Sequence, residues 1–140
     1  MAVNDDLDPD TNFTQLQNLN DMSQYIEEGA LNSFIQNPGN ASFTCLHINS
    51  RSLKKNHNSV TNLISRLSKQ VSVIAISETW LMPSHENLFQ INGYNFVCKS
   101  RNAKIGGGVG LYLDCDLNFS NRNDLSFIKD AIECIFVEIN

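Results

Sequence analysis

Hydrophobic positions change their spacing twice between residues 43 and 76. Residues 43–48 (Phe-Thr-Cys-Leu-His-Ile) form a short apolar run that predicts a buried strand. A helix over 53–69 is predicted by apolar residues that recur on one face, namely Leu53, Val60, Leu63, Ile64 and Leu67. Residues 71–76 (Val-Ser-Val-Ile-Ala-Ile) predict a second buried strand. This order predicts a βαβ unit with parallel strands and a right-handed crossover.

The rest of the chain after residue 76 has the pattern of short strands. We expect strands at 94–99, after Asn92-Gly93, at 109–113, after a run of glycines, and at 131–139. No helical spacing is visible between these strands, and a doubly wound fold would need it. The pattern therefore predicts an α/β layered sandwich that begins with the βαβ unit.

Residues 1–41 differ from this body. They are rich in Asn and Asp, whose side chains compete for backbone hydrogen bonds and favour turns and caps. Between Met22 and Ile35 the apolar residues approach helical spacing, but Gly29 interrupts it and a short helix is the most we expect. We therefore predict a mostly disordered leader over 1–41 and a folded domain over 42–140.

The charge is divided in the same way. The whole chain carries a formal net charge of −5, but residues 1–50 contain seven acidic residues and no Lys or Arg. Residues 51–140 contain eight acidic and ten basic residues, which gives a net charge of +2. The pI near 5.0 therefore describes the leader, and the body that would meet a partner is mildly basic.

Two further features limit the class of protein. No apolar run approaches the roughly 18 residues of a membrane span, and the N-terminus lacks the pattern of a signal peptide, so we expect an intracellular protein without a membrane partner. The four cysteines are far apart and form no Cys-x-x-Cys pair, namely Cys45, Cys98, Cys115 and Cys134. This spacing favours reduced thiols buried on strands over a zinc site or a disulfide framework.

Polar residues with metal-binding chemistry follow the two strands of the βαβ unit. Asn49 comes at the end of the first strand, and Glu78 comes just after the second. If the strands are neighbours, both side chains emerge at one rim of the sheet, where ligands gather in α/β folds. A carboxylate beside a carboxamide suits Mg²⁺. A Glu after a strand is more often a solvated loop residue, so the spacing alone leaves both interpretations open.

Three other features have structural alternatives. The glycine run in 104–110 precedes a strand and is followed by no Gly-Lys-Ser/Thr, which favours close backbone packing over a phosphate cradle. His47, between two apolar neighbours, is better interpreted as a hydrogen-bonded structural residue than as a ligand. Trp80 either packs under its loop or lines a nucleic-acid groove, and the sequence does not favour one of these.

The chain resembles a known family over about residues 43–140. The similarity lies in the sequences Leu-His-Ile-Asn-Ser-Arg-Ser-Leu (46–53), Val-Ile-Ala-Ile-Ser-Glu-Thr-Trp-Leu (73–81), Gly-Tyr (93–94) and Gly-Gly-Gly-Val (106–109). They resemble the endonuclease/exonuclease/phosphatase superfamily, specifically the apurinic-like endonuclease of LINE-type non-LTR retrotransposons, whose polyproteins also carry a reverse transcriptase. Ser77 before Glu78 fits this group better than the deadenylase or lipid-phosphatase branches.

The resemblance implies a fold, a reaction and a site. The fold is a four-layer α/β sandwich of the DNase I type, and the reaction is Mg²⁺-dependent (or Mn²⁺-dependent) phosphodiester hydrolysis that nicks DNA in the nucleus to prime reverse transcription. By the resemblance, Glu78 binds the metal and Asn49 is the catalytic asparagine that orders metal and phosphate. Arg51 stands where some relatives carry a second acid. Arg51, Arg101 and Lys104 are candidate contacts to DNA phosphates, because their loops could share the rim with Glu78.

The family's remaining catalytic groups are expected elsewhere. Its catalytic Tyr, Asp-x-Asn pair and Ser-Asp-His sequence follow the strand that ends here at Asn140, and Asp114-Cys-Asp116 comes too early to be that pair. We therefore expect a partial sandwich that lacks its C-terminal half and is inactive by itself. The alternative is a non-catalytic remnant or interaction module. Either way, we expect self-association through an uncovered apolar sheet face that includes Val73, Ile74, Phe96, Val109, Leu111, Phe136 and Val137.

Overall fold

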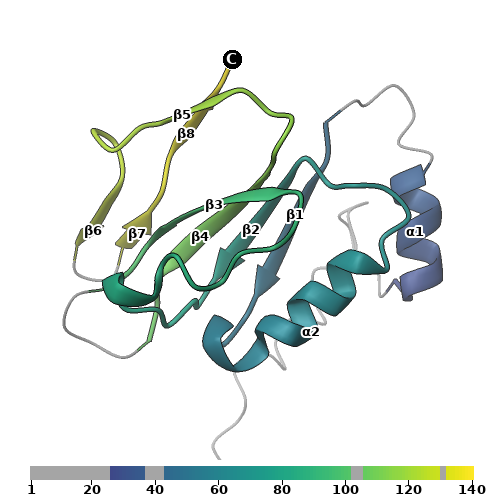
Figure 1. Cartoon of the computed structure of the whole chain (residues 1–140), viewed down its shortest axis with the longest axis horizontal. Helices are drawn as coiled ribbons and strands as arrows, with labels where there is room; N and C mark the ends of the chain where they lie inside the picture. Colours follow the sequence, from purple (N-terminus) through teal and green to yellow (C-terminus); the bar gives the residue numbers. More distant parts are fainter. Residues whose placement is uncertain (1–25, 37–42, 102–105, 130–131) are drawn as a thin grey trace, which may run out of the picture.

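A mixed four-stranded sheet with a helix packed on one face forms the centre of the molecule (Figure 1). The computed structural model describes residues 26–36, 43–101, 106–129 and 132–140. The strand order is β1-β2-β4-β3. The strands are β1 (Cys45–Asn49), β2 (Val73–Ser77), β3 (Tyr94–Lys99) and β4 (Val109–Asp114). The chain is thus of the general α/β class that the hydrophobic pattern predicts.

The predicted βαβ unit is confirmed. The helix α2 (Leu53–Ser65) connects β1 to β2, and the two strands pair in parallel with Asn49 opposite Ser77. The next strand across the sheet is β4, which runs antiparallel to β2 and places Val109 opposite Ser77. One end of the sheet therefore brings together the last residues of β1 and β2 and the first residue of β4.

The hydrophobic core lies between α2 and one face of the sheet. Ile74 and Ile76 of β2 are almost fully buried there together with Leu53 of α2. Tyr112 of β4 is also fully buried, and its hydroxyl donates a hydrogen bond of 2.7 Å to the Phe89 carbonyl in the loop after β2. That loop contains a single 3₁₀ turn, η2 (Pro83–His85). Helix and loop together cover this face.

The expectation of an uncovered apolar face is wrong for most of the residues that were predicted to form it. Val73 and Ile74 are consecutive residues of β2, so their side chains point to opposite faces of the sheet. Both are buried, and Phe96 stacks on Tyr112 with ring centroids 4.3 Å apart. Only Phe136 of that set, in the C-terminal segment, is exposed (45%).

A second helix, α1 (Glu28–Gln36), packs beside the end of α2. It confirms the short helix expected in the leader; residues 1–25 and 37–41 lie outside the described part of the chain. The Asn32 side chain donates to the Arg66 carbonyl (3.1 Å) and accepts from the Ser68 backbone N–H (2.8 Å). In a longer helix the Ser68 N–H would donate to the Ile64 carbonyl, but that carbonyl accepts from the Leu67 N–H (3.1 Å) and Ser68 binds Asn32 instead, so α2 ends at Ser65 and not at residue 69 as predicted.

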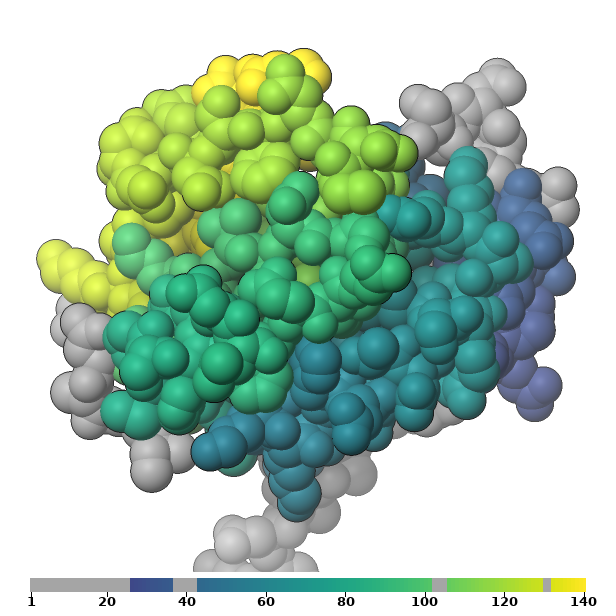
Figure 2. All heavy atoms as spheres, viewed as in Figure 1, coloured from purple at the N-terminus to yellow at the C-terminus, as the bar shows by residue number. Residues whose placement is uncertain are grey.

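The predicted strand over 131–139 is divided into two. β7 (Ile132–Cys134) pairs with β6 (Phe127–Lys129), and β8 (Val137–Ile139) pairs with β5 (Phe119–Asn121). The division falls where the Phe136 N–H donates to the Ser126 hydroxyl (2.9 Å) instead of to a neighbouring strand. In Figure 2 this yellow-green segment lies on the opposite side of the molecule from α1.

The cysteines test one smaller expectation. All four thiols are free, as predicted, but Cys45 and Cys115 are exposed and Cys98 and Cys134 are only partly buried, so the expectation of buried thiols is wrong. Cys45 is exposed because it lies on β1, an edge strand of the sheet. Within the described ranges, neither helix has the length and apolar character needed to cross a membrane.

Candidate functional site at the strand ends

Three loops converge at the edge of the sheet where β1 and β2 end and β4 begins. We call the loops 50–52, 78–80 and 106–108 the rim. Thr79 connects the three, because its N–H donates to the Gly108 carbonyl (3.2 Å) and its own carbonyl accepts from the Leu53 N–H (2.8 Å). On either side of Thr79, the Ser52 N–H donates to the Glu78 carbonyl (2.8 Å). The three loops are thus joined by their backbones.

The rim is held in an unusual backbone conformation. Four residues other than glycine have a positive φ in the described part of the chain, and all four belong to the rim: Arg51 (40°), Ser52 (90°), Glu78 (55°) and Trp80 (52°). Such residues cost of the order of 1–3 kcal/mol each and occur preferentially at functional sites. This concentration of strain identifies the rim as the candidate site.

The glycine run gives the rim its close packing. Gly107 and Gly108 have φ values of 71° and 85°. A Cβ on Gly108 would overlap the Thr79 hydroxyl, and a Cβ on Gly107 would overlap the side chains of Arg101 and Glu133. The interpretation as close backbone packing is therefore confirmed over that of a phosphate cradle.

Glu78 is held at the rim by two N–H donors on the same oxygen. Its Oε2 accepts a hydrogen bond of 2.7 Å from the Trp80 indole N–H and one of 3.2 Å from the Gly107 backbone N–H. These two bonds lower the pKa of the Glu78 carboxyl below its ordinary value of 4.5; partial burial opposes them, and the charges of Arg101 and Arg51 add to the lowering. Glu78 is therefore ionised at neutral pH.

Asn49 is the last residue of β1, and Arg51 lies in the loop that follows it. Asn49 ends β1 opposite Ser77, the residue before Glu78, as expected for parallel neighbours. Its Oδ1 accepts from the Arg51 backbone N–H (3.2 Å), which fixes the start of the loop. Both side chains are exposed, and the Arg51 guanidinium acts electrostatically on Glu78.

The other two predicted phosphate contacts differ from Arg51. Arg101 forms an ion pair with Glu133 of β7, in which the two side chains are only 27% and 11% exposed. Glu133 also accepts from the Gly108 N–H (2.7 Å), so it neutralises Arg101 and holds the glycine loop at the same time. Lys104 lies outside the described residues. Of Arg51 and Arg101, Arg51 is therefore the more exposed.

Sequence reasoning missed two side chains at the rim. Glu133 was not singled out, although an acidic residue between Ile132 and Cys134 in an otherwise apolar run indicates a buried partner. For Trp80 the sequence left two alternatives open, and its bond to Glu78 was in neither of them. His47 was interpreted correctly as hydrogen-bonded, because its Nε2 lies 3.1 Å from the Ser77 hydroxyl.

An acidic group at the far end of the sheet is separate from the rim. Asp114, Cys115 and Asp116 lie where β4 ends, and the Asp114 N–H donates to the carbonyl of Ser72, just before β2 starts. Asp116-Leu117-Asn118 has the letters of an Asp-x-Asn pair. A five-residue strand separates this group from Glu78, which is about 16 Å. It therefore contributes no ligand to the Glu78 site.

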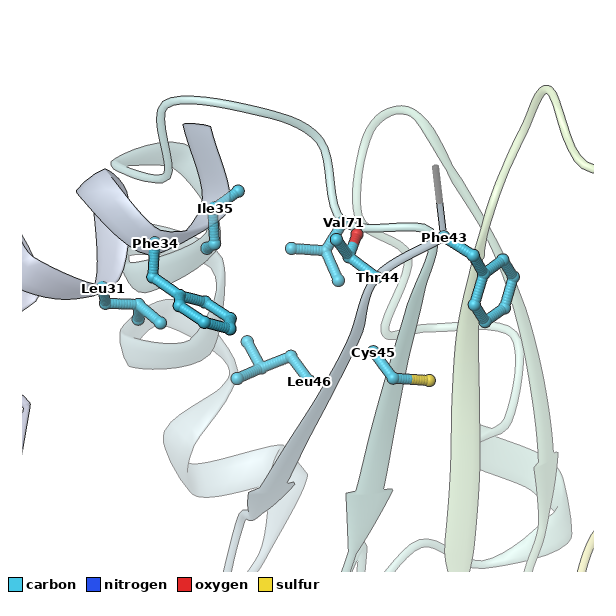
Figure 3. A pocket seen from close by; sticks show the side chains of 8 residues that line it. All are labelled: Leu31, Phe34, Ile35, Phe43, Thr44, Cys45, Leu46 and Val71. Carbon is cyan, nitrogen blue, oxygen red and sulfur yellow. The ribbon is translucent and has the colours of Figure 1, made fainter. Parts of the chain in front are cut away.

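An apolar pocket of about 210 Å³ lies between α1 and the start of β1, also away from the rim (Figure 3). Leu31 and Phe34 point from α1 toward Leu46 of β1, as Figure 3 shows. No charged side chain lines the pocket, and Thr44 is its most polar member. It offers mainly apolar contacts and no carboxylate that could hold a cation, so the rim remains the candidate site.

The rim has the donor set for one hard cation. Both hydrogen bonds that Glu78 accepts from described residues end on Oε2, so Oε1 accepts none from them. The exposed amide of Asn49 is the other oxygen donor in the adjoining loop. One ionised carboxylate and one amide fit Mg²⁺ or Mn²⁺, which retain several waters. No protein-family model matches this chain, and no curated protein matches it.

We expect Gly108→Ala to destabilise the fold by about 2–4 kcal/mol, because it combines an unfavourable φ of 85° with the overlap on Thr79. The measurement is urea unfolding followed by circular dichroism. Gly29→Ala in α1 is the matched control: its Cβ meets nothing within 4 Å, so the variant should be as stable as wild type or slightly more so. Equal effects of the two substitutions would contradict the packing argument.

The lowered pKa of Glu78 predicts that the stability of the fold depends on pH. A carboxyl whose pKa is lower in the folded chain stabilises the fold above its unfolded pKa, near 4.5, and this contribution is lost as the pH falls through the folded pKa. The stability difference between wild type and Glu78→Gln should therefore be largest above pH 4.5 and shrink below it. Urea unfolding of both proteins between pH 3 and pH 7 measures it; a difference that grows on acidification would refute the assignment.

Proposed function

We propose that this chain carries the metal-binding half of a Mg²⁺-dependent DNA endonuclease of the kind found in LINE-type retrotransposons. One observation carries the proposal: Glu78, ionised and fixed by two N–H donors, lies in a strained rim next to the strand end that bears Asn49. Many kinds of phosphodiesterase could use such a site, and the sequence resemblance favours this family among them. In the complete protein, the domain would be a DNase I-type sandwich that acts on nuclear DNA.

Glu78, Asn49 and Arg51 would have different roles in the proposed reaction. Glu78 and Asn49 would hold a Mg²⁺ or Mn²⁺ ion, which supplies charge stabilisation for the phosphate and the leaving oxygen. Arg51, exposed in the neighbouring loop, would contact a DNA phosphate. None of these three is a general base for the attacking water. The chain by itself therefore binds metal and DNA in this proposal without cleaving the DNA.

A non-catalytic interaction module is the second candidate. It is favoured by exposed apolar side chains in the short C-terminal strands and their connections, namely Leu125, Phe127, Ile132, Phe136 and Ile139. Two-stranded sheets are marginally stable alone, and their apolar residues favour association with another surface. In this alternative the chain would self-associate or bind a partner protein, and Glu78 would only be structural.

Cation binding at Glu78 separates these two candidates. We expect Mn²⁺, followed by electron paramagnetic resonance, to bind the wild-type chain and to lose this binding in Glu78→Ala. Asp116→Asn is the control, because it alters the acidic group at the other end of the sheet. Mn²⁺ binding that survives Glu78→Ala, or no binding at all, would reject the metal site and leave the interaction module. Relaxation of supercoiled plasmid in Mg²⁺ should show no nicking by this chain.

Charge reversal at Arg51 tests the DNA contact. Arg51→Glu should weaken DNA binding about equally for all sequences and reduce the salt slope by about one, because a phosphate contact is lost. Fluorescence anisotropy with a short duplex at several salt concentrations provides the measurement. Lys55→Glu is the matched control, since Lys55 is an exposed cation on α2 outside the rim. Equal weakening by both variants would indicate a general effect of charge and not a contact at the rim.

A further inference from the structure

Trp80 is the one aromatic residue of the rim, and its contacts differ from those of a packing residue. Its side chain is 41% exposed, so burial does not explain the strained φ of 52° that the residue adopts. Its backbone N–H donates to the Gly107 carbonyl (2.9 Å), and its indole N–H donates to Glu78 Oε2 (2.7 Å). The indole is thus fixed at its polar edge, with Glu78 as the partner.

The second donor on Glu78 comes from the same loop that holds Trp80. Gly107 donates its N–H to Glu78 Oε2 and accepts the Trp80 backbone N–H through its carbonyl. Trp80, Gly107 and Glu78 therefore form a closed set of three hydrogen bonds. Both donors bind one oxygen, Oε2, so a movement that takes Oε2 from its position without replacing it by the other oxygen breaks two bonds at once. This leaves Oε1 as the oxygen without a donor among the described residues.

From this arrangement we propose that Trp80 is a positioning residue for the cation site: its indole N–H holds Oε2 of Glu78 and so presents Oε1 to a divalent cation. The inference rests on the proposed function, because it assumes that Glu78 is a metal ligand. Groups that hydrogen-bond a ligating side chain commonly contribute about 10–100-fold to metal affinity. Removal of the indole N–H should therefore weaken cation binding while the fold is preserved.

The chain offers a direct readout of this bond. Trp80 is its only tryptophan, so a ¹⁵N-labelled sample gives one indole N–H resonance, and that resonance reports the contact to Glu78. We expect Glu78→Ala to move it, Mg²⁺ titration to move it in wild type, and Asp116→Asn to leave both properties unchanged. An indole resonance that stays in place in Glu78→Ala would overturn the proposal.

The second measurement removes the donor and retains an aromatic ring. Trp80→Phe should bind Mn²⁺ about tenfold more weakly than wild type in the paramagnetic resonance assay, in a chain that remains folded at the temperature of the assay. Equal affinity would refute the positioning role and leave the proposed metal site intact. If Trp80→Phe has a much lower melting temperature than wild type, the test of the Trp80–Glu78 contact is the indole resonance of the folded Glu78→Ala chain. If wild type shows no cation response at Glu78, the proposed function fails, and the positioning role fails with it.

Discussion

The rim depends on the backbone pairing of one buried residue, Thr79. Its N–H reaches the loop before β4 and its carbonyl reaches the first residue of α2, so one peptide segment joins three elements beyond the regular ends of the strands. Thr79 is fully buried, and its side chain lies against Gly108. The two residues that flank it, Glu78 and Trp80, both take a positive φ. We infer that the pairing of Thr79 imposes this strain, and the hydrogen bond between their side chains is its result.

The same constraint explains why the loop before β4 consists of glycines. Thr79 can approach Gly108 only if no Cβ intervenes, and Gly107 has side chains on the position that its own Cβ would take. Both also need a positive φ, which glycine adopts at little cost. The glycine run is therefore a packing requirement of the strand ends, and its backbone N–H groups are already engaged by Glu78 and Glu133. An anion would have to displace those carboxylates to use them.

The sequence predicted the parts of this structure that depend on local pattern. The helical spacing after Leu53 and the apolar runs on either side gave the βαβ unit, and the rule that ligands gather at strand ends then placed Asn49 and Glu78 on one rim. What could not be predicted depends on contacts between distant residues. Asn32 ends α2 early, Ser126 divides the last predicted strand, and Glu133 reaches a loop that precedes it by 25 residues. No periodicity encodes such contacts, because each is made by a single polar side chain.

Glu133 shows that the rim is not a property of the βαβ unit alone. Its carboxylate, only 11% exposed, binds Arg101 and the Gly108 N–H, and Gly107 next to it donates to Glu78. Two carboxylates from distant strands thus fix consecutive N–H groups of one loop, and the position of Glu78 depends on the segment that carries Glu133. Glu133 also neutralises the charge of Arg101. Of Arg51 and Arg101, Arg51 is the more exposed. The C-terminal strands therefore influence both the geometry and the charge of the rim.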